Sequence, residues 1–360
     1  MSSTEQFRIH PVSKSVVVVS PSRSKKLEQL KRKIARNWAD KARPGLISGE
    51  ECPFEYGHEE QTPGEYRAYR PHNTQPNSPG WWVRVVPNLY PAVNPNIVTP
   101  GDQLEEVSHG PFHTLPAYGL HYLIIESPEH NACLATTDDH QIREILHMWR
   151  EMFVFMGACR NIKYVSLFEN FGPLAGASQP HPHSQIVGLP IIPQRILTEL
   201  RGAKRYFDDN ERCFFCEEVE FEQRAKSRII AETQNYMAWC PYISKTPYQV
   251  LIGPKNHQSS FGNISTHASD GRQDPLTELA ALLHEIMQRI RVTLNDPDYN
   301  LYIHNGPSDQ PELDTFHWHI QIEPITEAIL AGFEKGNGIF INPRSPEHTA
   351  EDLRQAQINI

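Results

Sequence analysis

Two segments of the chain carry apolar residues at the three- and four-residue spacing of an amphipathic helix. In residues 138–157 the apolar positions are Ile142, Ile145, Leu146, Trp149 and Phe153. In residues 275–293 they are Leu279, Leu282, Leu283, Ile286 and Ile290. The second segment starts with a proline, which suits the first turn of a helix because the N–H that proline lacks would be unpaired there. The pattern predicts one long helix in each half of the chain.

Predicted strands flank each helix, and they occur in the same order twice. A strand leading to a histidine precedes each helix, at 122–130 and 248–257, and a strand ending in Asn and a Gly-Pro turn follows it, at 164–170 and 299–305. Each set closes with His-x-His-x-Gln-Ile, at 181–186 and 317–322. Alternation in a strand places both histidines and the glutamine of a run on one face.

This ordered repeat predicts an α+β fold of two tandem halves, each an antiparallel sheet with one or two helices. We place the halves at 1–195 and 205–360, with residues 190–212 linking them. The polar segment 258–275 is interpreted as a surface loop or insertion.

Composition narrows the class of partner. The chain has 360 residues, 39% of them hydrophobic, and a formal net charge of -9. An acidic balance argues against nucleic acid as a partner, because a polyanion needs a basic surface. The longest early apolar run, 16–19, is too short for a signal peptide or a membrane span. Six cysteines in a chain of this length do not form a disulfide framework. We therefore expect a soluble, cytoplasmic protein that holds a small anionic substrate with local donors.

The second half contains a candidate zinc site. Cys213 and Cys216 have the Cys-x-x-Cys spacing, and the repeat adds His257 and His317. Two thiolates and two imidazoles form a closed tetrahedral set suited to structural zinc. His304 is an alternative fourth ligand.

The equivalent positions of the first half are Cys52, Glu55, His130 and His181. Because glutamate replaces the second cysteine, the site is harder and weaker for zinc, and either an occupied or a lost site is consistent with the sequence. His58 is an alternative ligand. Three further cysteines, which have no such context, are expected to be buried small hydrophobes: Cys133, Cys159 and Cys240.

Several motifs resemble the galactose-1-phosphate uridylyltransferases, which belong to the histidine-triad superfamily. The main one is Phe168-Glu-Asn-Phe-Gly followed by Gly176-Ala-Ser-Gln-Pro-His-Pro-His-Ser-Gln185, and the segments 81–91 and 332–338 also fit. The resemblance extends over residues 8–355. The Cys-x-x-Cys of the second half is similar to the branch that includes plant ADP-glucose phosphorylase.

The resemblance implies that His183 is a nucleophile that carries a nucleotidyl group, because a neutral imidazole attacks phosphorus and forms a phosphoramidate. It further implies phosphate contacts for Gln185 and Ser178, a supporting role for Asn170, a place near the nucleoside for Asn88, and a phosphate contact for Arg23. A homodimer is also implied. His319 and Gln321 are interpreted as a degenerate copy that maintains structure or contacts the sugar across a dimer interface. Glu199 is interpreted as a structural residue.

Gln185 narrows the reaction. Histidine-triad hydrolases have a third histidine at this position, which can protonate a basic leaving group. A sugar phosphate is a weak base and needs no proton, so a neutral amide donor suffices. The expected activity is UDP-glucose:hexose-1-phosphate uridylyltransfer between a nucleotide sugar and a sugar 1-phosphate. An ADP-sugar phosphorylase with inorganic phosphate as acceptor, and a non-catalytic zinc protein that binds nucleotide sugars, are the alternatives.

Overall fold

The computed structural model describes residues 5–20, 52–97, 104–267, 273–310, 312–326 and 332–358. Its centre is one sheet with the strand order β10-β11-β12-β14-β13-β8-β9-β7-β4-β3, in which every neighbouring pair is antiparallel. The predicted α+β fold is confirmed.

Each half of the chain contributes half of this sheet. The first half supplies β3 (Arg67–Tyr69), β4 (Val83–Pro87), β7 (Leu120–Ile125), β8 (Tyr164–Phe171) and β9 (His183–Leu189). The second half supplies β10 (Ile229–Glu232), β11 (Tyr236–Trp239), β12 (Val250–Pro254), β13 (Tyr299–His304) and β14 (His319–Pro324). The two half-sheets are joined edge to edge by β8 and β13, with Tyr299 opposite Phe171 and Ile303 opposite Leu167.

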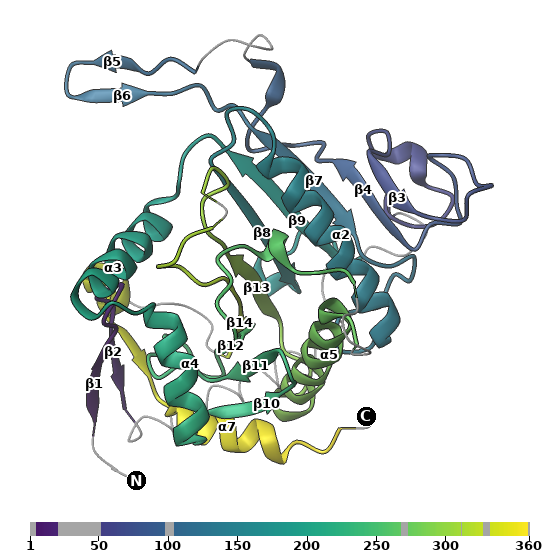
Figure 1. Ribbon diagram of the computed structural model, residues 1–360. Coiled ribbons are helices and arrows are strands. Elements are labelled where there is room, and N and C mark those ends of the chain that lie inside the picture. The colour runs from purple at the N-terminus through teal and green to yellow at the C-terminus, as the bar shows by residue number, and fades with distance from the viewer. Residues whose placement is uncertain are drawn as a thin grey trace.

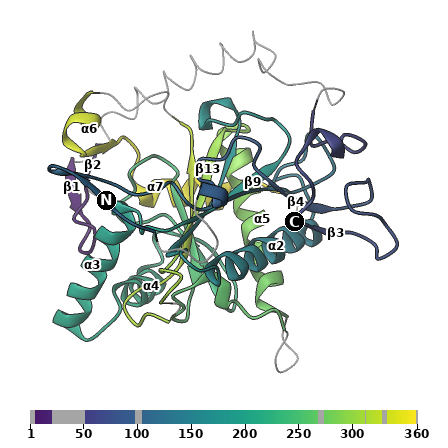
Figure 2. The same cartoon turned by 90° about the horizontal axis from the view of Figure 1, so that it is seen from above.

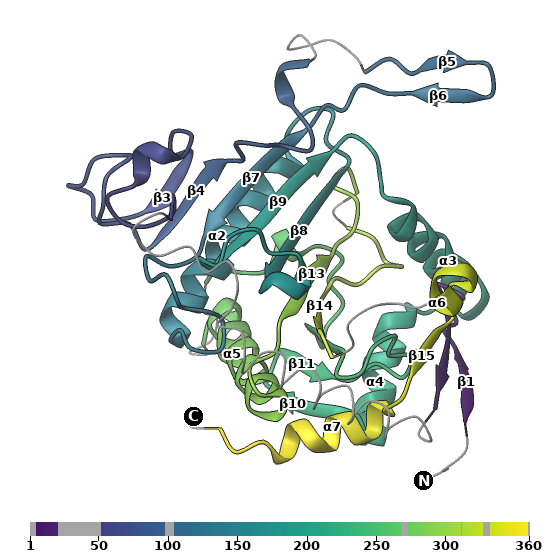
Figure 3. The same cartoon turned by 180° about the vertical axis from the view of Figure 1, so that it is seen from behind.

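The two predicted long helices, α2 (Asp139–Gly157) and α5 (Pro275–Leu294), cover one face of the sheet (Figure 1). Both begin with an aspartate cap: Asp138 accepts a hydrogen bond from the backbone of Gln141, and Asp274 accepts one from Thr277. Their apolar faces pack on inward-facing strand residues such as Ile186 to form the core. The opposite face of the sheet is free of these two helices (Figure 3).

The remaining elements lie at the ends of the sheet. A small sheet is formed by β1 (Gln6–Ile9), β2 (Val16–Val19) and β15 (Phe340–Asn342), and β2 and β15 are parallel. It lies beside α6 (Gly332–Asn337), at the end opposite β3 (Figure 2). A hairpin of β5 (Val107–His109) and β6 (Phe112–Thr114) projects from the body (Figure 1). Helix α7 (Pro346–Gln355) packs against α5 and β10.

The segment between the halves is a helix in the structure. Residues expected only to link the halves form α3 (Gln194–Asn210), followed directly by α4 (Phe214–Ala225). Within the expected loop 258–275, residues 258–267 contain only a short 3-10 turn at Phe261–Asn263. Among the described residues, no helix combines the length and the apolar character that crossing a membrane requires.

Gly172 directs the chain after β8. Its φ of 82° lies in the left-handed region, and a Cβ there would be 2.2 Å from the carboxylate of Asp298, so only glycine fits. The same carboxylate accepts a hydrogen bond from the backbone of Leu174 at 2.7 Å. The loop that carries Ser178 is thereby attached to the second half.

Candidate active site and metal-binding groups

His183 is the first residue of β9, and its ring is oriented by the backbone two residues earlier. Its Nδ1 lies 2.9 Å from the carbonyl oxygen of His181. The carbonyl can only accept, so Nδ1 carries the proton of the neutral ring and the lone pair lies on Nε2. The side chain is buried, and burial lowers its pKa. The geometry thus maintains a neutral imidazole with an available nitrogen lone pair.

Gln185 lies two residues further along the same face of β9, in a cluster that the sequence did not reveal. Its Oε1 is 3.0 Å from Nε2 of His121, on the neighbouring strand β7. The backbone N–H of Ala92 donates to Nδ1 of His121 at 3.1 Å, so this ring carries its proton on Nε2. His121 therefore donates to Gln185 Oε1, and the amide NH2 of Gln185 is left to face away from the ring.

The other predicted substrate residues occupy three different positions. Asn88 lies beside the Gln185 cluster, with its Nδ2 3.1 Å from Nε2 of His121, but both atoms are donors in this tautomer. Asn170 is on β8, where its Oδ1 accepts a hydrogen bond from Asn300 at 2.8 Å. Ser178 is exposed in the loop before β9. Arg23 lies outside the described residues.

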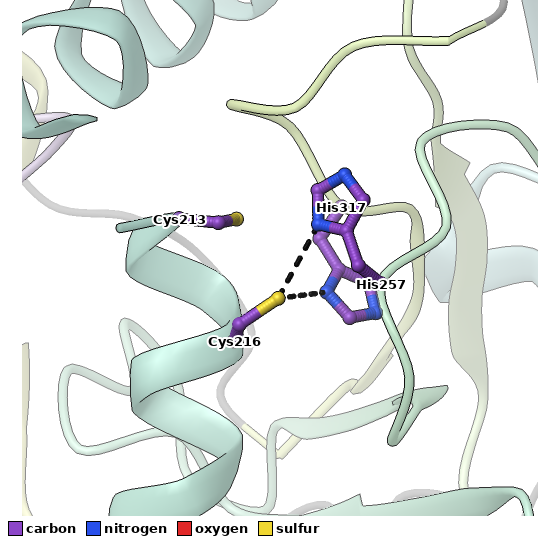
Figure 4. A group of neighbouring side chains, drawn as sticks. All are labelled: Cys213, Cys216, His257 and His317. Carbon is purple, nitrogen blue, oxygen red and sulfur yellow. Dashed lines mark hydrogen bonds between the residues drawn. The ribbon is translucent and has the colours of Figure 1, made fainter. Parts of the chain in front are cut away.

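The four predicted zinc ligands of the second half converge on one point (Figure 4). Cys213 precedes α4 and Cys216 is in its first turn, so both sulfurs point the same way. Cys216 Sγ is 3.3 Å from His257 Nδ1 and 3.6 Å from His317 Nδ1. His257 Nε2 lies 2.8 Å from the carbonyl of Leu313, which directs the Nδ1 lone pair to the sulfurs.

The chemistry of this group suits a metal. The hydrogen bond between the two sulfurs lowers the pKa of the Cys213 thiol and raises that of Cys216, so Cys213 is the first of the two to become a thiolate. All four ligand atoms lie within 4.8 Å of one another. The donor set matches the Cys2His2 requirement of tetrahedral zinc.

The first half has an equivalent group with one carboxylate. Glu55 Oε2 is 3.2 Å from His130 Nδ1 and 3.3 Å from His181 Nδ1, and Cys52 Sγ is 3.7 Å from His181 Nδ1. His181 Nε2 donates to the carbonyl of Ser127 at 2.7 Å, the same arrangement that orients His257 in the other group. The structure brings together all eight residues predicted from the repeat.

The two alternative ligands have other partners. His58 Nδ1 lies 2.7 Å from the backbone carbonyl of Cys52, and His304 Nδ1 lies 3.0 Å from Glu199 Oε2. Glu199 is therefore in an ion pair, which holds its pKa at about 2 against the opposing effect of burial. Its position in α3 gave no signal in the sequence, because its partner is more than a hundred residues away.

A second feature missed from the sequence is a pair of carboxyls beneath β9. Glu126 and Glu169 are 2% and 1% exposed, on the helix-covered side of the strand. Burial raises the pKa of Glu169 to about 7 and that of Glu126 well above its ordinary value, with repulsion from Glu169 as the second cause. The hydroxyl of Tyr299 donates to Glu169 at 2.7 Å. Charged residues in strands ordinarily indicate an exposed face, so only the structure places them in the core.

The fold and the site define a class of protein. An internally duplicated antiparallel sheet, with His-Pro-His-Ser-Gln entering a central strand, is the arrangement of a nucleotidyl-transfer enzyme. The chain belongs to the galactose-1-phosphate uridyl transferase family: residues 2–193 match the model of the family's N-terminal domain and residues 199–357 match that of its C-terminal domain.

Relatives with two different activities are similar to the chain. An ADP-glucose phosphorylase of Arabidopsis thaliana is 32% identical over 98% of this chain and 93% of its own length. A galactose-1-phosphate uridylyltransferase of Thermotoga maritima is 28% identical over 70% of this chain and 78% of its own. The crystal structure of an Arabidopsis thaliana ADP-glucose phosphorylase with bound ADP-glucose has a TM-score of 0.77 and 31% identity, and the match covers 99% of this chain and 100% of that one.

Proposed function

We propose that the chain transfers a nucleoside monophosphate between two phosphates through a covalent intermediate on His183. The observation that carries this proposal is the hydrogen bond from His183 Nδ1 to the carbonyl of His181, which leaves Nε2 as the nucleophilic atom. Because the ring is buried and its pKa is lowered, no proton has to leave it before attack.

The reaction has two displacement steps. Nε2 of His183 attacks the phosphorus nearer the nucleoside in a nucleotide sugar, an N–P bond forms, and the P–O bond to the sugar phosphate breaks. The electron pair leaves with the sugar 1-phosphate, which needs no proton at neutral pH. An oxygen of the acceptor phosphate then attacks the same phosphorus, and the N–P bond breaks to restore the imidazole lone pair.

Gln185 would stabilise the charge that develops on the phosphoryl oxygens. Its NH2 group is available because His121 occupies its Oε1. A fixed amide donor directed at a developing oxyanion stabilises the transition state more than the ground state. His121 is accordingly a positioning residue, and Asn88, Asn170 and Ser178 remain proposed substrate contacts.

We propose an ADP-sugar, with inorganic phosphate as acceptor, as the first substrate pair to test. It is supported by the similarity to the Arabidopsis ADP-glucose phosphorylase, which spans nearly all of both chains. UDP-glucose with a hexose 1-phosphate, the pair expected first from the sequence, is the second candidate and is supported by the similarity to the Thermotoga enzyme.

We further propose structural zinc at the Cys213 group and weaker zinc binding at the Glu55 group. In each donor set one histidine donates through Nε2 to a backbone carbonyl, which directs its Nδ1 to the other ligands. A homodimer and a cytoplasmic location stay predictions, as does the division into domains at 1–195 and 205–360.

The covalent intermediate can be trapped directly. The protein is incubated separately with ADP-glucose and UDP-glucose, each radiolabelled in the phosphate next to the nucleoside, and acid-labile label on the protein is counted. We expect label from one of the two, its discharge by the matching acceptor, and its loss in His183→Ala. His319→Ala is the matched control, because it changes the equivalent histidine of the second half. No label from either nucleotide, or equal labelling of His183→Ala, would refute the proposal.

A further inference from the structure

A cavity of about 420 Å³ lies over the second half of the sheet, apart from the residues proposed for transfer. Its floor includes His304, His319 and Gln321, and its walls come from α3, α4 and the turn between β1 and β2. These elements gather around the same end of the sheet (Figure 3). The volume is in the range of pockets that enclose small organic ligands.

The internal duplication relates this cavity to the transfer site. His319 Nδ1 lies 3.4 Å from the carbonyl of His317, and His183 Nδ1 lies 2.9 Å from that of His181, so Nε2 of His319 also carries the lone pair. Phe215, two residues after Cys213, packs on His319 at 5.7 Å between ring centres. Phe54, two residues after Cys52, packs on His183 at 5.4 Å. The cavity therefore lies over the second copy of the same strand face.

One cation of the cavity makes no direct ion pair with a described residue. Among the described residues Lys245 forms no ion pair, and its ammonium lies 5.5 Å from the centre of the Phe340 ring. Burial lowers the pKa of Lys245 and repulsion from Arg195 lowers it further, whereas attraction from Glu199 and Glu323 opposes both effects. Because Arg195 is already engaged with Glu199 at 3.6 Å, the ammonium of Lys245 is the group that an anion would stabilise.

Three carboxylates of the wall are bonded directly to partners other than Lys245. Glu199 faces His304 at 3.0 Å, Glu217 accepts from the Tyr206 hydroxyl at 2.9 Å, and Glu222 pairs with Arg228 at 2.8 Å.

The rest of the wall is apolar. Aromatic side chains of α3 and α4 line it, including Tyr206, Phe214 and Phe215. At the surface, Ile9, Phe221 and Tyr242 are 60%, 52% and 43% exposed, which marks an apolar mouth to the cavity. A ligand with its anionic group at Lys245 would thus place the rest of its structure against aromatic rings.

We propose that this cavity is a second ligand site, separate from the transfer site, that binds an organic phosphate with its phosphate at Lys245 and its body against Phe214 and Tyr206. A nucleoside monophosphate and a sugar phosphate share this chemistry. The site does not use His183 and does not depend on which nucleotide is transferred.

The test measures how many ligands the full-length protein binds. Equilibrium dialysis with AMP, glucose 1-phosphate or inorganic phosphate is carried out on wild type, Lys245→Gln, and the control Lys204→Gln, whose charge pairs with Asp208 on the exposed side of α3. For AMP or for glucose 1-phosphate, we expect wild type and Lys204→Gln to bind one more equivalent than Lys245→Gln. Alternatively, Lys245→Gln should bind that additional equivalent at least tenfold more weakly. The compound that shows this difference, AMP or glucose 1-phosphate, identifies the organic group that is attached to the phosphate. An unchanged binding isotherm in Lys245→Gln for both would overturn the proposal, as would inorganic phosphate binding as tightly as the organic phosphates.

Two further measurements separate this site from the transfer reaction. His183→Ala should retain the Lys245-dependent site even though it cannot be labelled, so loss of labelling and loss of this site are independent results. If Lys245→Gln does not fold, a Phe214→Trp variant that retains Lys245 provides a fluorescent reporter in the wall. Its emission should change on addition of the organic phosphate that binds, and an unchanged emission would overturn the proposal.

Discussion

Replacing His121 by phenylalanine tests whether this residue orients Gln185. The imidazole connects two groups: it accepts from the backbone of Ala92 at 3.1 Å and donates to Gln185 Oε1 at 3.0 Å. Phenylalanine fills a similar volume but can do neither. The Gln185 amide then loses the contact that distinguishes its oxygen from its nitrogen, and its NH2 group no longer has a fixed direction.

The size of the effect follows from the bonds that are lost. A neutral hydrogen bond contributes about 0.5–1.5 kcal/mol net, and here the bond to Gln185 is the one that reaches the substrate. A loss of about 1.4 kcal/mol in transition-state stabilisation corresponds to about a tenfold fall in kcat/KM. Because Gln185 is proposed to stabilise developing charge, we expect kcat to fall more than the affinity for the nucleotide sugar.

The assay is initial-rate release of sugar 1-phosphate, measured on His121→Phe, Gln185→Ala and the double variant. His140→Phe, an exposed histidine at the start of α2, is the matched control and should be unaffected. If His121 acts through Gln185, its replacement should add almost nothing in the Gln185→Ala background. A full second tenfold loss in the double variant, or an unchanged kcat/KM in His121→Phe, would refute the reasoning.

Three further predictions concern the metal groups and the core. Cys216→Ser should lower bound zinc by about one equivalent per chain and lower the melting temperature. The control Cys159→Ser should leave the zinc content unchanged. Equal zinc content in the two variants would contradict the ligand set. Glu55→Cys should raise the zinc affinity of the first-half group in a chelator competition, because thiolate is the softer ligand, and weaker binding would argue against a metal there. The pKa of Glu169 is raised from 4.5 to about 7, so the folded state binds its proton more tightly than the unfolded chain, and stability falls as pH rises between these values. Glu169→Gln should therefore gain stability relative to wild type as pH rises from about 5 to about 8 in urea unfolding, and a constant difference would contradict this.

The repeat allowed the metal groups to be predicted, since each ligand has a fixed place relative to a strand end or a helix start. Cys213 and Cys216 are one helical turn apart, and His257 follows β12 while His317 precedes β14, the antiparallel neighbour of β12. Local spacing and strand pairing together bring such residues to one point. The internal repeat in the sequence therefore predicted which residues form each of the two metal-ligand groups.

The sequence did not reveal the role of His121 or the partner of Glu199, because both depend on contacts that have no periodic signal. His121 acquires its tautomer only because the loop after β4 returns to place Ala92 against the ring. Glu199 acquires its partner only when α3 packs across β13 and approaches His304. The helical character of 194–210 was detectable, however, because Ile196, Leu200 and Ala203 recur at helical spacing.

The pairing of β8 with β13 has a consequence for any attempt to produce the two halves separately. Cutting the chain between them would leave each half with a full-length strand bare along one side, with its N–H and C=O groups unpaired. Each fragment would then act as a template for the other, or for a copy of itself. Co-expressed fragments should assemble into a nicked protein, while a single fragment should self-associate or aggregate.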